Sequence, residues 1–131
     1  MWVVLLVVRA KRQPSGANCT DGPSTFGFIT SAGYNLSSEG TCAPYFNQTG
    51  DVNGQNPNLG SLAAHGGPTF TQWPSLPSPA IDAIPNGANG CGATLITDQR
   101  GAPRPINSQC DIGAVEIGWP YPQLWLPLIR R

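Results

Sequence analysis

The hydrophobic residues of this chain lie in short runs that are separated by turn-forming residues. Five runs favour extended structure, and each is bounded by Gly, Pro, Asn or Ser: residues 26–30, 69–73, 80–84, 94–97 and 111–117. The best helical candidate, residues 59–65, is followed at once by Gly66, Gly67 and Pro68. No longer window has the spacing of an amphipathic helix. The pattern therefore predicts an all-β fold with long irregular connections.

Composition limits the classes of partner. The 131 residues suffice for one domain with a modest core. Only 11% of the residues are charged and the formal net charge is zero, so the chain lacks the basic surface that nucleic-acid binding requires. The 16 glycines and 14 prolines separate the apolar runs, which favours turns between strands over an unstructured chain.

The four cysteines predict disulfide bonds: Cys19, Cys42, Cys91 and Cys110. No two of them form a Cys-x-x-Cys pair, which disfavours a zinc site. Disulfides would stabilise a small chain with few large apolar residues, and they indicate an oxidising compartment. The sequence permits three connectivities. We favour the local pairs, Cys19–Cys42 and Cys91–Cys110, each of which closes a loop of about 20 residues.

Residues 1–17 form an apolar lead and linker. Arg9, Lys11 and Arg12 follow the apolar run at 2–8, whereas a secretory signal has its charges before the run. The run is too short to span a bilayer, which needs about 20 residues. We interpret it as a buried strand or as a truncated or misassigned start, with a degenerate export signal as a third alternative.

The charged side chains of the second half are the candidates for chemistry: Asp82, Asp98, Arg100, Arg104, Asp111 and Glu116. One interpretation is a structural clamp, in which ion pairs and carboxylate-to-backbone hydrogen bonds hold the final loops closed. The other is a carbohydrate-cleaving site, since two carboxylates about 5–10 Å apart can hydrolyse a glycoside. Small residues follow Asp82 and Asp111, which favours the clamp.

Nucleophilic catalysis finds little support. His65 is the only histidine, and it precedes Gly66 and Gly67 at a predicted turn. Any Ser-His-Asp or Cys-His site would have to use it. The chain has no Gly-x-Ser-x-Gly elbow, no His-Glu-x-x-His motif and no phosphate loop. We therefore predict no catalytic residue and no cofactor.

A weak calcium site is one interpretation of Asp51, Asn53 and Asn56, which offer oxygen ligands. An EF-hand is excluded, because Gly54 comes too early in the loop and Leu62 stands where the closing glutamate belongs. The alternative is a surface turn stabilised by Asp and Asn side chains.

Short phrases of small residues with single charged side chains follow one another in a fixed order. The upstream ones are Ile29-Thr-Ser-Ala-Gly-Tyr-Asn-Leu-Ser37, Gly50-Asp-Val-Asn53, Asn58-Leu-Gly-Ser-Leu62 and Gly66-Gly-Pro-Thr69. The downstream ones are Ser78-Pro-Ala-Ile-Asp-Ala83, Thr97-Asp-Gln-Arg-Gly-Ala-Pro-Arg-Pro105 and Cys110-Asp-Ile-Gly-Ala-Val-Glu116. In these phrases the chain resembles a choice-of-anchor Q domain, and the resemblance extends over roughly residues 18–117.

That resemblance implies a bacterial exported protein and a right-handed parallel β-helix, of which residues 18–117 would be the C-terminal coils and a disulfide-tied, loop-rich cap. The preceding coils of the parent chain would be its partner, and the location would be extracellular or at the cell surface. Such a cap has a physical purpose. The last coil of a solenoid leaves an unpaired strand edge, which Pro-rich loops can block.

Residues 118–131 form a tail rich in proline and aromatic residues, and it is too short to span a membrane. The resemblance implies a sorting or attachment tail, with cell-envelope components or polysaccharide as possible partners. The alternative is an extended tail that packs on the last coil. Trp119 and Trp125 are candidates for partner contact, whereas Trp73 is expected in the core or at its rim.

We therefore expect a non-catalytic structural end domain. Two alternatives stay open. The chain could belong to a carbohydrate-active β-helix enzyme or adhesin whose active surface lies on upstream coils. It could also be a free-standing, disulfide-rich binding protein.

Overall fold

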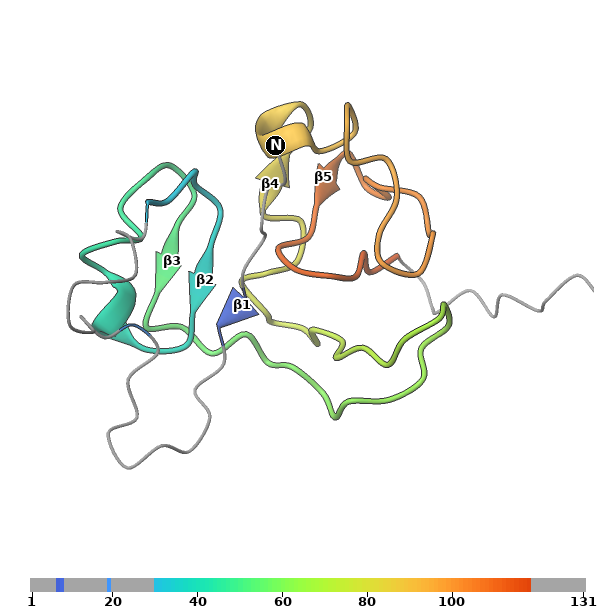
Figure 1. Cartoon of the computed structure of the whole chain (residues 1–131), viewed down its shortest axis with the longest axis horizontal. Coiled ribbons are helices and arrows are strands. Elements are labelled where there is room, and N and C mark those ends of the chain that lie inside the picture. Colours follow the sequence, from blue (N-terminus) through green and yellow to red (C-terminus); the bar gives the residue numbers. More distant parts are fainter. Residues whose placement is uncertain (1–6, 9–18, 20–29, 119–131) are drawn as a thin grey trace, which may run out of the picture.

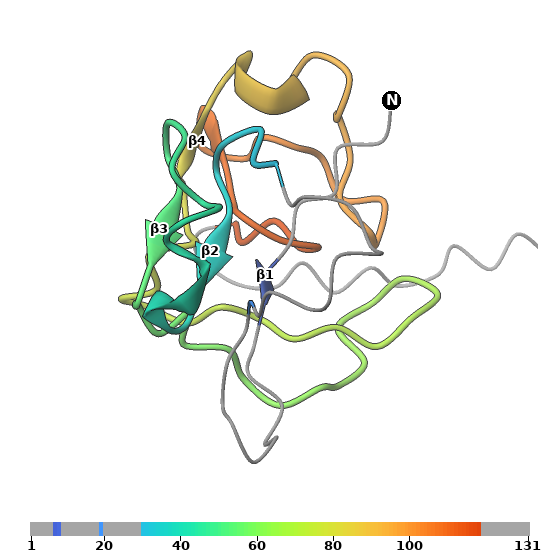
Figure 2. The ribbon, with the colours of Figure 1, turned by 60° about the vertical axis from the view of Figure 1, so that its left-hand side comes forward.

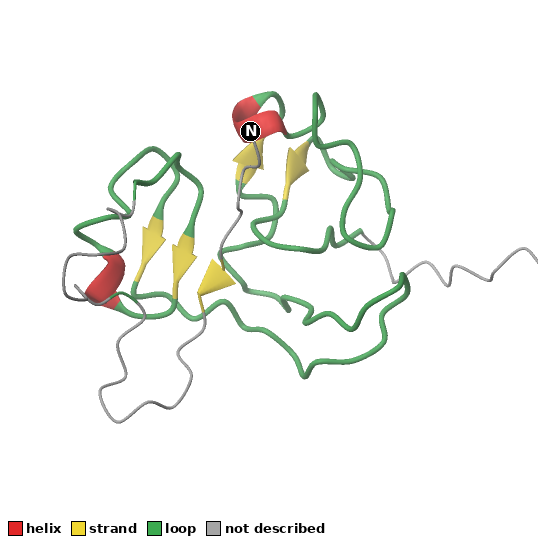
Figure 3. Ribbon diagram, in the orientation of Figure 1, coloured by secondary structure: helices red, strands yellow, loops and turns green. Residues whose placement is uncertain are grey.

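The computed structural model describes residues 7–8, 19 and 30–118 (Figure 1). Its regular elements are short: strands β1 (Val7–Val8), β2 (Leu36–Ser37), β3 (Val52–Asn53), β4 (Ile84–Pro85) and β5 (Gln109–Cys110), and the 3-10 helices η1 (Gly40–Cys42) and η2 (Ala88–Gly90). Loops and turns make up most of the rest (Figure 3). The described part thus confirms the predicted non-helical chain with long irregular connections, but it shows no β-helix solenoid.

One sheet holds β1, β2 and β3 side by side in chain order, and both pairings are parallel (Figure 1). Leu36 pairs with Val7 on one side and with Val52 on the other. Residues 7–8 of the apolar lead thus form a strand, and the rest of the lead lies outside the described residues.

The second sheet is the antiparallel pair β4–β5, with Ile84 opposite Cys110. It belongs to a loop-rich region at residues 78–118, which lies beside the parallel sheet in both views (Figures 1 and 2). Asn89 of η2 joins the two regions, because its amide nitrogen donates to the carbonyl of Gly33 at 3.0 Å.

The main core connects these two sheets. Its buried members come from both of them and from the loops between: Leu36, Ala80, Ile84, Cys91, Cys110 and Ile112. A smaller cluster of Cys19, Cys42 and Phe46 lies in the first half of the chain. Because one core holds β2 together with β4 and β5, the loop-rich region packs against the parallel sheet rather than hanging free of it.

The predicted strand at residues 111–117 is wrong, because strand β5 ends at Cys110 and bends follow. Three backbone N–H groups in this segment donate to carboxylates, whereas that of Ile112 donates to the carbonyl of Ala80 at 2.7 Å. The N–H of Asp111 donates to Glu116, that of Glu116 to Asp98, and that of Ile117 to Asp111. Charged acceptors form stronger hydrogen bonds than carbonyls, so they replace the ladder here.

The other predicted strands are also shorter than expected or lie elsewhere. Of residues 80–84 only Ile84 is in a strand, because Ser78 and Pro79 open a turn. Residues 69–73 and 94–97 form isolated bridges only. Residues 26–29 lie outside the described residues.

The helical candidate at residues 59–65 is extended. Antiparallel bridges join Leu59 to Pro74 and Ala63 to Thr71, so this segment runs back along residues 71–74. The glycines at 66 and 67, both with positive φ, turn the chain between the two arms. We call residues 59–74 the long hairpin. In the described ranges, no helix has the length and apolarity needed to cross a membrane.

Candidate functional site

The charged residues predicted from the sequence meet in the loops that surround β5, and we call Asp98, Arg100, Arg104, Asp111 and Glu116 the loop clamp. Arg100 and Asp98 form an ion pair at 2.7 Å, with side chains that are 9% and 0% exposed. The guanidinium of Arg100 also donates to the carbonyl of Glu116 at 2.7 Å. This first pair thus ties residues 98–100 to the end of the described chain.

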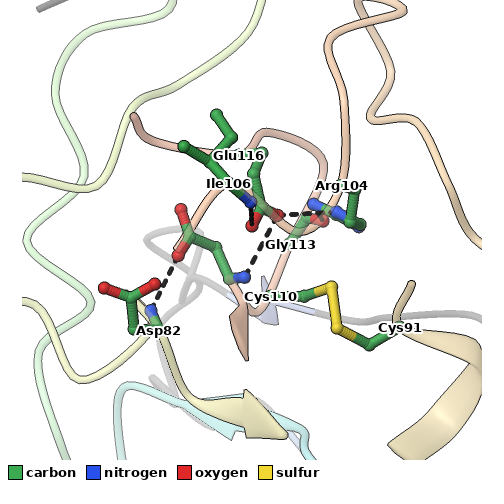
Figure 4. The surroundings of a disulfide bond; sticks show 8 residues. Asp82, Cys91, Arg104, Ile106, Cys110, Gly113 and Glu116 are labelled. Carbon is green, nitrogen blue, oxygen red and sulfur yellow. Dashed lines mark hydrogen bonds and ion pairs between the residues drawn. A yellow bond between two sulfur atoms is a disulfide. The ribbon is translucent and has the colours of Figure 1, made fainter. Parts of the chain in front are cut away.

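The second ion pair of the clamp joins Arg104 to Glu116, with 2.7 Å between Nε and Oε2 (Figure 4). Arg104 also donates to the carbonyl of Gly113 at 3.1 Å, and the Glu116 carboxylate accepts the N–H of Ile106 at 3.3 Å and that of Asp111 at 3.2 Å. Burying such a pair is favourable only when further hydrogen bonds satisfy the remaining atoms, as they do here.

Asp111 is fully buried and acts as an acceptor for two loops. Its Oδ1 accepts the N–H of Asp82 at 2.7 Å, and its Oδ2 accepts the N–H of Ile117 at 2.6 Å. Burial raises the pKa of Asp111 to about 6, and the nearby carboxylates of Glu116 and Asp82 act in the same direction against the two N–H donors.

Asp98 and Glu116 respond to burial in opposite ways. Burial alone would raise the pKa of Asp98, but the N–H of Glu116 and the guanidinium of Arg100 outweigh it and hold that pKa below its usual value. Burial raises the pKa of Glu116 despite its bonds to Asp111 and Arg104. The ionised form of Asp98 is therefore favoured by its surroundings, whereas that of Glu116 is not.

Asp82 enters the site through its backbone. Its N–H donates to Asp111, but its own Oδ1 is buried with no hydrogen-bond partner in the described part of the chain. Its φ of 49° lies in the left-handed region, which a non-glycine residue rarely adopts. The sequence predicted that the charged side chain of Asp82 belongs to the clamp. In the structure it is the backbone N–H of Asp82 that contacts the clamp, through its hydrogen bond to Asp111.

Two aromatic rings and the clamp residue Arg100 form a stack that was not expected from the sequence. The rings of His65 and Trp73 are stacked with centroids 4.5 Å apart, and the guanidinium of Arg100 lies 5.3 Å from the Trp73 ring. Nδ1 of His65 lies 3.0 Å from the carbonyl of Thr71. The only histidine is thus part of a local turn, and its contacts join residues 65–73 to the clamp through Arg100.

Two disulfides are present, and they join Cys19 to Cys42 and Cys91 to Cys110. Both pairs are the local ones favoured from the sequence. The second bridge adjoins the clamp, since Cys110 directly precedes Asp111 (Figure 4).

The residues considered for calcium form hydrogen bonds that stabilise turns. Asp51 accepts the N–H groups of Asn35 at 2.8 Å and Gln48 at 2.9 Å. Burial opposes ionisation of Asp51, but these bonds and those from side chains prevail and lower its pKa. The amide of Asn53 donates to Phe46, and Oδ1 of Asn56 accepts the N–H of Asn58. Among the described residues, no cluster of His, Cys, Asp and Glu is arranged to hold a metal ion.

The predicted partner-contact residues Trp119 and Trp125 lie outside the described residues. Comparison of the chain with models of known families, with curated proteins and with solved structures found no match.

Proposed function

We propose that this chain is a non-catalytic structural end module of an exported parallel β-helix protein, which closes the solenoid after its last coils. In this proposal residues 18–117 resemble a choice-of-anchor Q domain, and residues 118–131 serve as a sorting or attachment tail. The preceding coils of a parent chain are the partner, and the location is the cell surface or the medium. Disulfides, of which the chain has two, are typical of extracellular proteins.

The observation that carries this proposal is the order of the parallel sheet. Strands β1, β2 and β3 lie next to one another in the order in which they occur in the chain, all in the same direction. Stacked coils of a parallel solenoid produce this order, because each coil adds one strand beside the preceding one. A further coil would extend the sheet at β1, whose second edge has no partner strand among the described residues.

The loop-rich region supports the closing role. It packs against β2 through the shared core, and its two strands are antiparallel, so the parallel order stops there. Pro85 occupies half of β4 and cannot donate a backbone hydrogen bond. A region of this kind packs on the sheet and offers little edge of its own for further pairing.

The clamp supports a structural role over a catalytic one. The side chains of Asp98 and Glu116 are 0% and 1% exposed, and Asp111 is also fully buried. Both oxygens of each carboxylate accept hydrogen bonds from the protein. A glycosidase needs carboxylates that reach the substrate, whereas these are engaged in closing loops.

A fusion experiment tests the capping function. A soluble parallel β-helix whose own C-terminal cap has been deleted is joined directly to the chain at Val7. The control carries the same domain behind a long Gly/Ser linker, which keeps it attached but unstacked. We expect light scattering to show a monomer for the direct fusion and self-association for the linker fusion. Equal association of the two fusions would show that the module does not cap.

A further inference from the structure

An open groove lies where the long hairpin, residues 59–74, joins the rest of the chain. Its walls are two segments, residues 56–60 and 75–77, Ser38 also lines it, and its volume is about 610 Å³. This size is within the range of ligand sites in proteins. The two segments lie side by side below the parallel sheet in Figure 1.

Hydrogen bonds fix the walls of the groove to each other. The N–H of Gly60 donates to the carbonyl of Trp73 at 2.8 Å, and the N–H of Ser75 donates to that of Asn58 at 2.9 Å. The buried hydroxyl of Ser78 also donates to the carbonyl of Pro57, at 2.6 Å. The groove is therefore preformed, and a ligand would not have to order its walls.

The groove has polar groups but no charge, since none of its lining residues is acidic or basic. Asn56 uses Oδ1 to accept the N–H of Asn58. The remaining Nδ2 of Asn56, the side-chain amide of Asn58 and the hydroxyl of Ser75 make no hydrogen bond within the described residues. Leu76 adds an apolar side chain that is 73% exposed.

We propose that this groove binds a neutral oligosaccharide. Side-chain amides and hydroxyls both donate and accept, which suits the hydroxyl groups of a sugar, and Leu76 offers an apolar surface to the C–H face of a sugar ring. An ionic ligand would find no counter-charge here. An extended peptide is disfavoured because backbone groups of the two walls at Asn58, Gly60 and Ser75 already bond across the groove.

Calorimetric titration of the full chain tests this site. The neutral probes are cellotetraose, xylotetraose, maltotetraose and chitotetraose, and polygalacturonate is the anionic probe. We expect saturable binding of a neutral probe, weakened about tenfold by Asn58→Gly, since one lost hydrogen-bonding side chain has this effect. Glycine keeps the left-handed backbone of Asn58, whose φ is 48°. Leu76→Ala should weaken binding as well.

Two variants outside the groove serve as matched controls. Ser108 is exposed and has a φ of 77°, so Ser108→Gly repeats the loss of a polar side chain from a left-handed position outside the groove. Leu62 is 62% exposed, so Leu62→Ala repeats the loss of an exposed leucine side chain. Absence of saturable binding of all neutral probes at millimolar concentration would overturn the proposal. Preference for polygalacturonate, or equal weakening by the control variants, would also overturn it. None of these results depends on whether the module caps a solenoid.

Discussion

The guanidinium of Arg104 lies 2.7 Å from the carboxylate of Glu116, and both residues are buried. Twelve positions separate them in the chain, so their contact closes a loop that contains β5. The same carboxylate also accepts the N–H groups of Ile106 and Asp111. One acidic side chain thus fixes three points of the loop, which explains why no regular ladder is needed there.

Removing one partner of this pair should be strongly destabilising. Arg104→Met leaves the Glu116 charge buried without its counter-ion, and the expected loss is about 3–5 kcal/mol of unfolding free energy. Urea denaturation followed by tryptophan fluorescence measures it. The double variant Arg104→Met/Glu116→Gln removes both charges and should recover part of that loss. A single variant as stable as the double one would contradict the role of the pair.

The disulfide next to this loop should contribute to stability as well. The Cys91→Ser/Cys110→Ser variant opens a bridge with a sequence separation of 19, and the loss expected for a loop of this size is about 3 kcal/mol. Cys19→Ser/Cys42→Ser, with a separation of 23, is the matched comparison. Because Cys91 and Cys110 belong to the main core, we expect their replacement to cost more. Urea denaturation of both variants checks this order, and the reverse order would contradict it.

The sequence predicted the disulfide bonds, which depend on residue type and spacing. It did not predict where side-chain carboxylates compete with backbone carbonyls for backbone N–H groups. The local cysteine pairs follow from their spacing, and the lack of long helices in the described ranges follows from the density of Gly and Pro. The strand predicted at residues 111–117 failed, because an apolar run does not reveal that buried carboxylates will take its N–H groups. The stack of His65, Trp73 and Arg100 was also missed, since no periodicity connects the three positions.

Stability should decrease with rising pH in the mildly acidic range. The pKa of Asp111 is about 6 in the folded chain, whereas its ordinary value is 3.8. A raised pKa means that the folded state holds the proton more tightly, so this contribution is complete below pH 3.8 and is lost as the pH rises through 6. The raised pKa of Glu116 acts in the same direction. The shift of Asp111 corresponds to a loss on the order of 3 kcal/mol.

Asp98 and Asp51 should limit stability on the acid side. Their pKa values lie below the ordinary 3.8, so their contributions are present above that pH and are lost as the pH falls further. Urea denaturation at a series of pH values should therefore show maximum stability at about pH 4. Asp111→Asn should flatten the decline between pH 4 and about 6. An unchanged decline in that variant would show that another group is responsible.

The turn between the two arms of the long hairpin allows a test with adjacent glycines. Gly66 and Gly67 both have positive φ, at 88° and 75°. A Cβ atom at Gly66 would meet open space, whereas one at Gly67 would lie 2.8 Å from Cα of Arg100. Gly66→Ala should therefore cost only the backbone strain, about 1–2 kcal/mol, and Gly67→Ala should cost clearly more.

The two alanine variants separate the strain of the turn from its packing on the clamp. Thermal unfolding followed by circular dichroism gives the stability loss of each variant. The difference between the two losses measures the cost of the steric contact between a Cβ atom at residue 67 and the backbone of Arg100. Because Arg100 holds Asp98 and stacks on Trp73, displacement of its backbone by Gly67→Ala should also alter the fluorescence of Trp73. Gly66→Ala should leave that fluorescence unchanged. Equal stability losses and equal spectra would show that the turn of the long hairpin does not pack against Arg100.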